Sequence, residues 1–298
     1  MGGSAVNVMS MTERRCLLSV HAHPDDESSK GPGTIARYHA DGVHTVLVTC
    51  TGGEEGEILN PALDREDVRL NLAQVRLQEL ERAVQIIGYD ELIMLGYRDS
   101  GMVGTEANDN PSSFHQAPIE EAVERLVKIL RETRPQVIVT YPEDQGGYQH
   151  PDHIRVHEIS MLAFEAAGDP LQYPNAGEPF TPSKLYYSVW SKDQLLERHA
   201  KFDEHGIDSP YSEGPFLKWF ERDEPPATTR IELNGFAHVR SDALLAHETQ
   251  IDPSSKFWFG LPLEVEHSIF SYEMFTLARS NIGPLDLSED DLFAGVEG

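Results

Sequence analysis

The stretch CLLSVHAHPDDE, residues 16–27, joins a largely apolar run to a cluster of histidines and carboxylates. Residues 16–22 predict a buried strand, because a short apolar run of this length is typical of strands covered on both faces. The cluster that follows is costly to bury unless its charges are paired or bind a metal ion. The stretch therefore predicts a functional site at the end of the first strand.

Strands and helices alternate downstream of this stretch. Further strands are predicted at about 44–51, 91–97 and 135–142. Helices are predicted at 34–42, at 66–87 with Gly88 ending it, from Pro118 onward, and at 150–168. Such alternation is typical of a parallel sheet with right-handed crossovers. We predict an α/β fold with a Rossmann-like, mostly parallel sheet flanked by helices.

The pattern loosens in the last third of the chain. Strands are predicted at 183–190 and 228–234 and a helix at 236–251, while the acidic, Pro- and Gly-rich residues 203–227 predict a surface excursion. Neither an internal repeat nor a clear linker divides the chain.

We therefore predict one domain after a short tail. The tail covers 1–15 and the domain 16–298, with a catalytic core over about 16–180 and a C-terminal elaboration over about 181–298 that completes the substrate cleft.

Composition narrows the class of protein. The chain of 298 residues carries 24 basic and 50 acidic side chains, a net charge of −26. This charge repels phosphate backbones and anionic membranes, so we expect neither a nucleic acid nor a membrane as partner. No apolar run reaches the ~18 residues of a membrane span, and the first residues lack the apolar segment of a signal peptide. With Cys16 and Cys50 expected as reduced thiols, we predict a cytoplasmic protein.

Polar loops follow each of the first four predicted strands. Besides the opening stretch, they are TGGEEGE (51–57), YRDSG (97–101) and EDQGGYQHPDH (143–153). In open α/β sheets, ligands bind outside the carboxyl ends of the strands. We therefore expect the four loops to face one cleft.

Two of these loops contain residues spaced as metal ligands. His23 and Asp26 are three positions apart, and so are His150 and His153. Two histidines and one carboxylate leave a fourth position open, which is how catalytic zinc is held, although this donor set also suits Fe²⁺. One histidine from each of the two loops is enough for such a site. We expect His157, one turn further along the helix, to pack instead of binding metal.

Asp25 and Asp26 are adjacent and are expected to divide two tasks. Neighbouring residues in extended chain point in opposite directions, so one carboxylate can bind metal while the other faces the attacking water. Zinc lowers the pKa of water toward ~7, which lets a carboxylate accept its proton. We expect His21 to support the site or to pack in the core.

The motifs HAHPDDE and GGYQHPDH resemble those of the zinc-dependent de-N-acetylases of the LmbE-like, or N-acetylglucosaminylphosphatidylinositol deacetylase, superfamily. Longer strings, among them TGGEEGEILNPALD, LGYRDSGM, AHETQIDP and DLFAGVE, look like its mycothiol branch, and the resemblance covers roughly 16–297. It implies one zinc ion per chain and a small thiol–sugar conjugate as substrate.

The resemblance also implies a role for individual residues. The implied zinc ligands are His23, Asp26 and His153, and the implied general base is Asp25. The implied supporting catalytic residues are His150 as the acid that assists the leaving amine or steadies the oxyanion, Asp152 orienting it, and Tyr148 polarising the carbonyl. The residues implied to hold the sugar and inositol hydroxyls are Glu57, Arg76 and Asp99.

Lys30 bears on the choice between two activities of this branch. The branch that cleaves the amide between S-conjugated N-acetylcysteine and glucosaminyl-inositol carries lysine there, whereas the branch that deacetylates N-acetylglucosaminyl-inositol is expected to carry a small polar residue. The resemblance favours the amidase. The alternatives are the deacetylase, a relative that acts in antibiotic biosynthesis, and a sugar-binding protein without activity. A pure binder has no need of a general base such as Asp25, which argues against the last.

Overall fold

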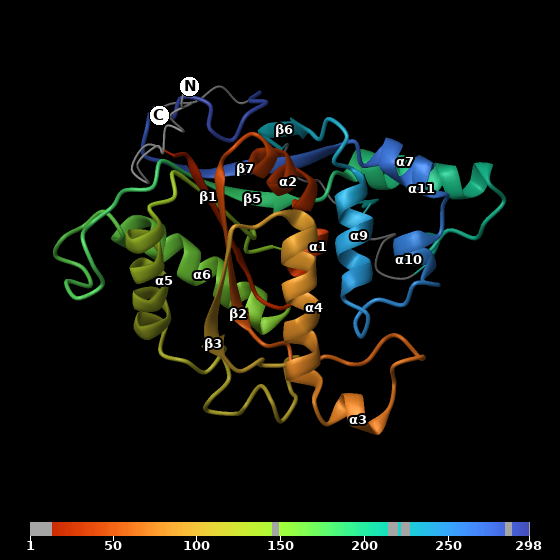
Figure 1. Ribbon diagram of the computed structural model, residues 1–298, viewed down its shortest axis with the longest axis horizontal. Coiled ribbons are helices and arrows are strands. Elements are labelled where there is room, and N and C mark those ends of the chain that lie inside the picture. The colour runs from red at the N-terminus through yellow and green to blue at the C-terminus, as the bar shows by residue number, and fades with distance from the viewer. Residues whose placement is uncertain (1–13, 145–148, 214–219, 222–226, 284–287, 298) are drawn as a thin grey trace, which may run out of the picture.

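A seven-stranded sheet in the order β3-β2-β1-β4-β5-β7-β6 organises the protein (Figure 1). The computed structural model describes residues 14–144, 149–213, 220–221, 227–283 and 288–297. The strands are β1 (Cys16–His21), β2 (His44–Thr51), β3 (Glu91–Tyr97), β4 (Val137–Thr140), β5 (Lys184–Val189), β6 (Thr229–Glu232) and β7 (Tyr272–Ser280).

The first five strands are parallel, which confirms the predicted Rossmann-like fold. β1 pairs with β2 on one side and with β4 on the other, so the strand order reverses at β1. At such a reversal the loops after the two neighbouring strands diverge and leave room for a ligand. β7 runs antiparallel to both β5 and β6 and extends the sheet beyond this parallel part.

Helices cover both faces of the sheet. In the core they are α1 (Asp26–Ser29), α2 (Pro32–Ala40), α3 (Glu66–Arg69), α4 (Leu72–Ile87), α5 (Ile119–Thr133) and α6 (Pro151–Ala166). The later helices are α7 (Lys192–Glu204), α9 (His238–Ala246), α10 (Lys256–Phe259) and α11 (Leu263–Ile269). Figure 1 shows α5 and α6 on one side of the sheet and α2, α4 and α9 on the other.

The helix predicted at 66–87 forms as two helices. Asn71 has φ −122°, outside the helical region, and separates α3 from α4. Gly88 ends α4 with φ 92°, a conformation that glycine adopts without the strain a Cβ would cause. The predicted end of this helix is confirmed.

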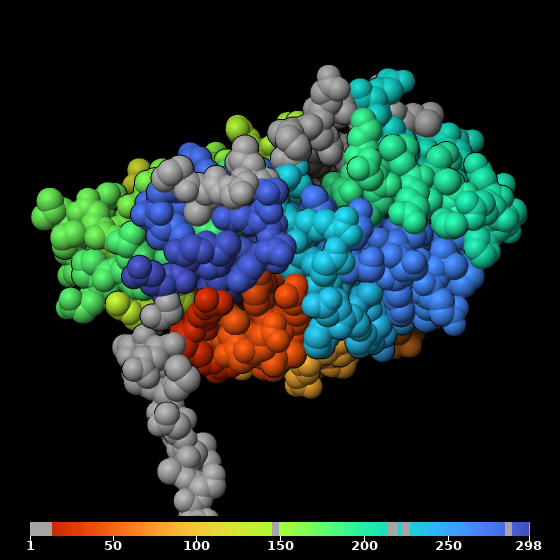
Figure 2. All heavy atoms as spheres, turned by 90° about the horizontal axis from the view of Figure 1, so that it is seen from above, coloured from red at the N-terminus to blue at the C-terminus, as the bar shows by residue number. Residues whose placement is uncertain are grey.

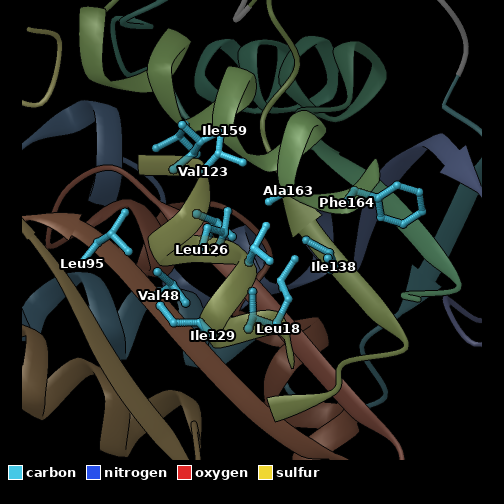
Figure 3. Packing of buried hydrophobic residues seen from close by; sticks show 14 of the residues in the cluster. Leu18, Val48, Leu95, Val123, Leu126, Ile129, Ile138, Ile159, Ala163 and Phe164 are labelled. Carbon is cyan, nitrogen blue, oxygen red and sulfur yellow. The ribbon is translucent and has the colours of Figure 1, made fainter. Parts of the chain in front are cut away.

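Alternate residues of the strands feed two hydrophobic cores. Leu18 faces the core under α5 and α6, and Figure 3 shows it at the same end of this cluster as Val48 and Ile129. Leu17, the neighbour of Leu18, belongs to the core on the other face of the sheet, under α2, α4 and α9. The central strands are therefore buried on both sides, as their continuous apolar sequences predict.

The last third of the chain joins the same sheet and adds a third, smaller core. Leu195, Phe202 and Ile269 meet between α7 and α11 in this core. The predicted strands near 183–190 and 228–234 form as β5 and β6, and the helix predicted at 236–251 forms as α9. β7, which lies between β5 and β6, is absent from the sequence predictions.

The predicted tail and the predicted excursion are only partly described. Residues 1–13 lie outside the described residues, whereas Arg14 Nε donates to the Gly42 carbonyl at 2.8 Å. Of the excursion at 203–227, residues 214–219 and 222–226 also lie outside them.

The end of the chain returns to its beginning. Figure 2 shows the C-terminal residues, in blue, beside the N-terminal residues in red, and the Tyr38 hydroxyl donates to Asp291 at 2.7 Å. No helix in the described part of the chain has both the length and the apolar character needed to cross a membrane.

Candidate metal centre

Three buried side chains meet where β1 and β4 end. His23 follows β1, Asp26 begins α1, and His153 lies in the first turn of α6. His153 Nε2 lies 3.3 Å from Asp26 Oδ2 and 3.3 Å from His23 Nδ1, and the latter two atoms are 3.6 Å apart. Metal–ligand bonds of ~2.0–2.1 Å in a tetrahedron place ligand atoms ~3.3 Å apart. The triangle therefore fits a divalent cation in both spacing and donor chemistry.

Local backbone structure sets the two histidines in place. The His23 amide donates to Asp26 Oδ2 at 3.0 Å, which closes the turn between β1 and α1. Pro151 opens α6, and His150 caps it because its Nδ1 accepts the Asp152 amide proton at 3.2 Å. His153 is thereby held in the first turn of the helix, with its ring beside that of His23.

The second nitrogen of His23 faces two further carboxylates. His23 Nε2 lies 3.2 Å from Asp152 Oδ2 and 3.5 Å from Asp99 Oδ1. Asp152 in turn accepts the Ser100 amide at 2.9 Å and the Ser100 hydroxyl. A metal-binding histidine is commonly oriented by a carboxylate on its other nitrogen, and Asp152 has that position here. Burial lowers the pKa of His23, but its carboxylate partners outweigh this and raise it well above its usual value.

Asp25 has an uncommon backbone conformation next to the triangle. Its φ of 115° lies in a region that residues with a Cβ rarely adopt. Arg76 Nη2 lies 3.0 Å from Asp25 Oδ2 and 2.5 Å from the Pro24 carbonyl, so the guanidinium holds both side chain and backbone. Burial raises the pKa of Asp25, although Arg76 opposes the rise. A raised pKa makes a carboxylate a better proton acceptor.

Two glycines in the loop after β2 leave the space that the Arg76 side chain occupies. Arg76 donates to the Gly53 carbonyl at 2.5 Å, and a Cβ at Gly53 or Gly56 would lie 2.4 Å from the guanidinium. Arg76 is only 3% exposed. Sequence reasoning from helix position would leave it on the surface, whereas the structure buries it against the loops of β1 and β2.

His150 lies beside the triangle. Its ring centroid is 4.6 Å from that of His23, in an edge-on arrangement. Burial, together with the nearby His23 and His153, lowers the pKa of His150 to about 4. An oxygen of Asp152 lies within 4.8 Å of a His150 ring nitrogen.

The residues expected to bind substrate differ in their burial and in their distance from the triangle. Asp99 is buried, with its carboxylate accepting the Gly101 amide at 2.9 Å, and Glu57 is exposed on the loop after β2. The Lys30 ammonium contacts Asp26 Oδ1, the oxygen that faces away from the histidines, and lies 5.2 Å from the centroid of the Tyr141 ring. Tyr148 lies outside the described residues.

His21 and His157 lie outside the triangle, as expected. His21 Nδ1 lies 2.8 Å from the Tyr141 hydroxyl, and His157 Nδ1 lies 3.0 Å from the Tyr141 carbonyl. Tyr141 itself stacks within 4.9 Å of the His153 ring. Sequence reasoning missed Tyr141, whose side chain contacts His21, His153 and Lys30.

Glu27 and His247 were also missed. His247 Nε2 lies 2.6 Å from Glu27 Oε1, and both side chains are completely buried. The signal was present, since Glu27 ends the opening motif and His247 stands in AHETQIDP, but nothing in the sequence joins two residues 220 positions apart.

Comparisons with known proteins show the family of this chain. Residues 18–164 match the family model described as PIG-L: GlcNAc-PI de-N-acetylase. The chain is 41% identical over 296 residues to a mycothiol S-conjugate amidase of Streptomyces coelicolor, covering 96% of this chain and 99% of that protein. The chain belongs to the PIG-L family.

A second relative of this PIG-L protein has a different activity in its name. A 1D-myo-inositol 2-acetamido-2-deoxy-alpha-D-glucopyranoside deacetylase of Geodermatophilus obscurus is 40% identical over 296 residues, covering 97% of this chain and 100% of that protein. A solved structure, N,N'-diacetylchitobiose deacetylase from Pyrococcus horikoshii, superposes with a TM-score of 0.60 at 17% identity over 90% of this chain and 85% of that one, and so shares the fold. The PIG-L protein is an enzyme of an amidohydrolase and deacetylase family.

Proposed function

We propose that the protein is a zinc-dependent amidase that acts on mycothiol S-conjugates. It would hydrolyse the amide between S-conjugated N-acetylcysteine and glucosaminyl-inositol, a detoxification step, in the cytoplasm, where Cys16 and Cys50 stay reduced. The observation that carries the proposal is the position of Lys30, whose ammonium contacts Asp26 Oδ1. An ammonium there can donate to a carbonyl of the N-acetylcysteinyl group, which the acetylated sugar lacks.

The triangle of His23, Asp26 and His153 would hold the metal. When bound, Zn²⁺ supplies Lewis acidity that polarises a carbonyl and makes water a stronger acid. Asp25 takes the proton of the attacking water, with its carboxylate held by Arg76 at 3.0 Å. The raised pKa of Asp25 favours this transfer.

His150 is proposed to stabilise the oxyanion or to assist the leaving amine. Its Nδ1 accepts a backbone proton from Asp152, so a neutral ring carries its own proton on Nε2. An Nε2–H donor of this kind can face developing negative charge. Asp152 orients the ring through that backbone contact, and Tyr148 is proposed to polarise the carbonyl.

The two ends of the substrate are proposed to bind on opposite sides of β1. Glu57, Arg76 and Asp99, from the β2 and β3 side, would hold the sugar and inositol hydroxyls. On the β5 side a pocket begins at Ser29 and Gly31 and is lined mainly by the C-terminal third, through Trp190, Arg240, Phe270, Tyr272, Glu273 and Met274. Its aromatic walls suit an apolar S-linked group, so this third would complete the cleft.

Deacetylation of N-acetylglucosaminyl-inositol is the second candidate. The relatives named for the two activities are 41% and 40% identical to this chain, a difference too small to decide between them. The two reactions use the same metal centre and base and differ in the acyl group. Lys30 and the neighbouring pocket are the features that favour the larger acyl group.

The test compares both substrates with wild type and Lys30→Ala. We expect wild type to have the higher kcat/KM for the S-conjugate. Lys30→Ala should lower this kcat/KM by an amount that corresponds to about 1–3 kcal/mol of lost transition-state stabilisation, while acetyl cleavage is almost unchanged. Metal content is measured in parallel, because Lys30 contacts Asp26. Lys128→Ala, on an exposed lysine of α5, is the control and should alter neither rate. Faster acetyl cleavage by wild type would replace the amidase with the deacetylase.

A further inference from the structure

The uncommon backbone conformation of Asp25 needs a partner that holds it. Its φ of 115° places the peptide before it so that the Asp25 amide points inward, to Glu27 Oε2 at 2.9 Å. Backbone conformations of this kind persist only where surrounding contacts over-determine them, and they cluster at active sites. Glu27 is therefore the first candidate for a residue that fixes Asp25.

Glu27 is itself fixed from the far end of the chain. Its Oε1 receives the Ser28 hydroxyl at 2.5 Å and lies 2.6 Å from His247 Nε2. Glu27 and His247 are both 0% exposed. A buried carboxylate without a partner is costly, and the contact with His247 holds the Glu27 side chain in place with its other oxygen facing the Asp25 amide.

His247 follows α9, which brings it to the site from the C-terminal third. α9 packs against α4, the helix that carries Arg76. Asp25 is thus held from two directions, by Arg76 on its carboxylate and by Glu27 on its amide. The His247 Nδ1 atom is buried and has no hydrogen-bond partner among the described residues, so the contact with Glu27 is the one that fixes this ring.

We propose that Glu27 and His247 are positioning residues that hold Asp25 in the conformation needed to accept a proton from the attacking water. The inference rests on the proposed role of Asp25 as the base and holds for either acyl group. Other buried ion pairs lie in the C-terminal third, such as Arg198 with Glu266, and Arg198 also donates to Tyr211 and to the Phe257 carbonyl, outside the metal centre. They provide a matched comparison of the same chemistry.

Single substitutions give the first test. His247→Leu removes the contact to Glu27 at similar volume, and a misplacement of about 1 Å can cost ~10²-fold, so we expect kcat to fall by about that factor. KM should stay within about 2-fold, because the pair does not face the substrate, and metal content should not change. His247→Gln keeps a donor toward Glu27 and should recover at least about 10-fold of the loss. Glu266→Gln, the control, should leave kcat unchanged.

The deciding test repeats the substitution in an Asp25→Asn background. If the pair acts through Asp25, His247→Leu should lower the remaining kcat by less than about 3-fold, because the group it positions is already disabled. An equal fall in both backgrounds would show a merely structural role and overturn the inference. Should His247→Leu fail to fold, Glu27→Gln takes its place in the same cycle, with about a 10-fold fall expected in wild type alone.

Failure of the proposed mechanism and failure of the positioning role give different results. Near-wild-type turnover by Asp25→Asn would remove Asp25 as the base and with it the proposed mechanism. An impaired Asp25→Asn with additive effects at His247 would leave the mechanism intact and remove only the positioning role.

Discussion

Buried charges are arranged in opposite ways in the core of residues 16–167 and in the C-terminal third. Two buried pairs in the third are closed: Lys184 with Glu289 at 2.9 Å and Arg198 with Glu266 at 2.5 Å. In the core, by contrast, His23 is shared by three carboxylates and a second histidine.

This difference distinguishes buried charges that only support the fold from buried charges that form a functional site. A closed pair balances its own charge, and further hydrogen bonds satisfy what remains, as Tyr186 does for Glu289 at 2.8 Å. Asp26, Asp99 and Asp152 around His23 carry more negative charge than the imidazole and the Lys30 ammonium, which contacts Asp26, can balance together. Such a surplus, and not burial alone, marks the place where a cation fits.

The sharpest division between the two regions is expected in metal content. His23→Ala and His153→Ala should each lose the bound divalent ion, and kcat should fall by at least about 10³-fold, because the metal supplies several kcal/mol of transition-state stabilisation. Elemental analysis and turnover measure the two effects. His157→Ala removes a histidine that contacts the Tyr141 carbonyl at 3.0 Å and should retain the metal. Full metal content in both of the first two variants would remove the triangle as the binding site.

A closed pair is expected to affect stability and not turnover. Lys184→Met leaves Glu289 buried without its cation and should lower the free energy of unfolding by about 3–5 kcal/mol, while kcat of the folded enzyme changes less than about 2-fold. Denaturant unfolding and turnover below the transition are the measurements. Lys128→Met, in a pair 61% exposed on both sides, should cost less than about 1 kcal/mol. A 10-fold fall in kcat at full folding would erase the contrast between the regions.

A glycine pair tests how tightly the core holds Arg76. Gly53→Ala adds a Cβ 2.4 Å from the guanidinium at a φ of 67°, whereas Gly42→Ala meets nothing within 4 Å at a φ of 87°. In both variants the left-handed backbone conformation should lower the free energy of unfolding by ~1–2 kcal/mol. Gly53→Ala should lower it by a further ~1–3 kcal/mol, because it displaces Arg76. Thermal unfolding compares the two, and only Gly53→Ala should also lower kcat. Equal effects of the two substitutions would mean that Arg76 moves aside freely.

The sequence predicted the parallel sheet and brought the ligand motifs to one edge of it. This worked because apolar runs and His–Asp spacing are local properties, and because the carboxyl ends of parallel strands meet at one edge. Spacing alone left open whether His150 or His153 joins His23 and Asp26, and it was the resemblance to the family that implied His153.

Features that depend on distant pairing could not be predicted in this way. β7 mixes Glu273, Thr276 and Arg279 with apolar residues, and its place between β5 and β6 depends on the tertiary fold. The contact between Glu27 and His247 spans 220 residues, and the burial of Arg76 depends on glycines in another loop. The resemblance implied that Asp152 orients His150, whereas its carboxylate lies 3.2 Å from His23 Nε2, a contact that spacing alone does not reveal.

β7 is translated long after its partner β5, and this order has a consequence for folding on the ribosome. β5 ends at Val189, but its antiparallel partner is not made until residues 272–280 have been translated. During that interval, nascent chains present an open strand edge, which can pair with other chains. Truncation before Tyr272 would make this aggregation hazard permanent, so a premature stop should yield inclusion bodies in place of a smaller folded fragment.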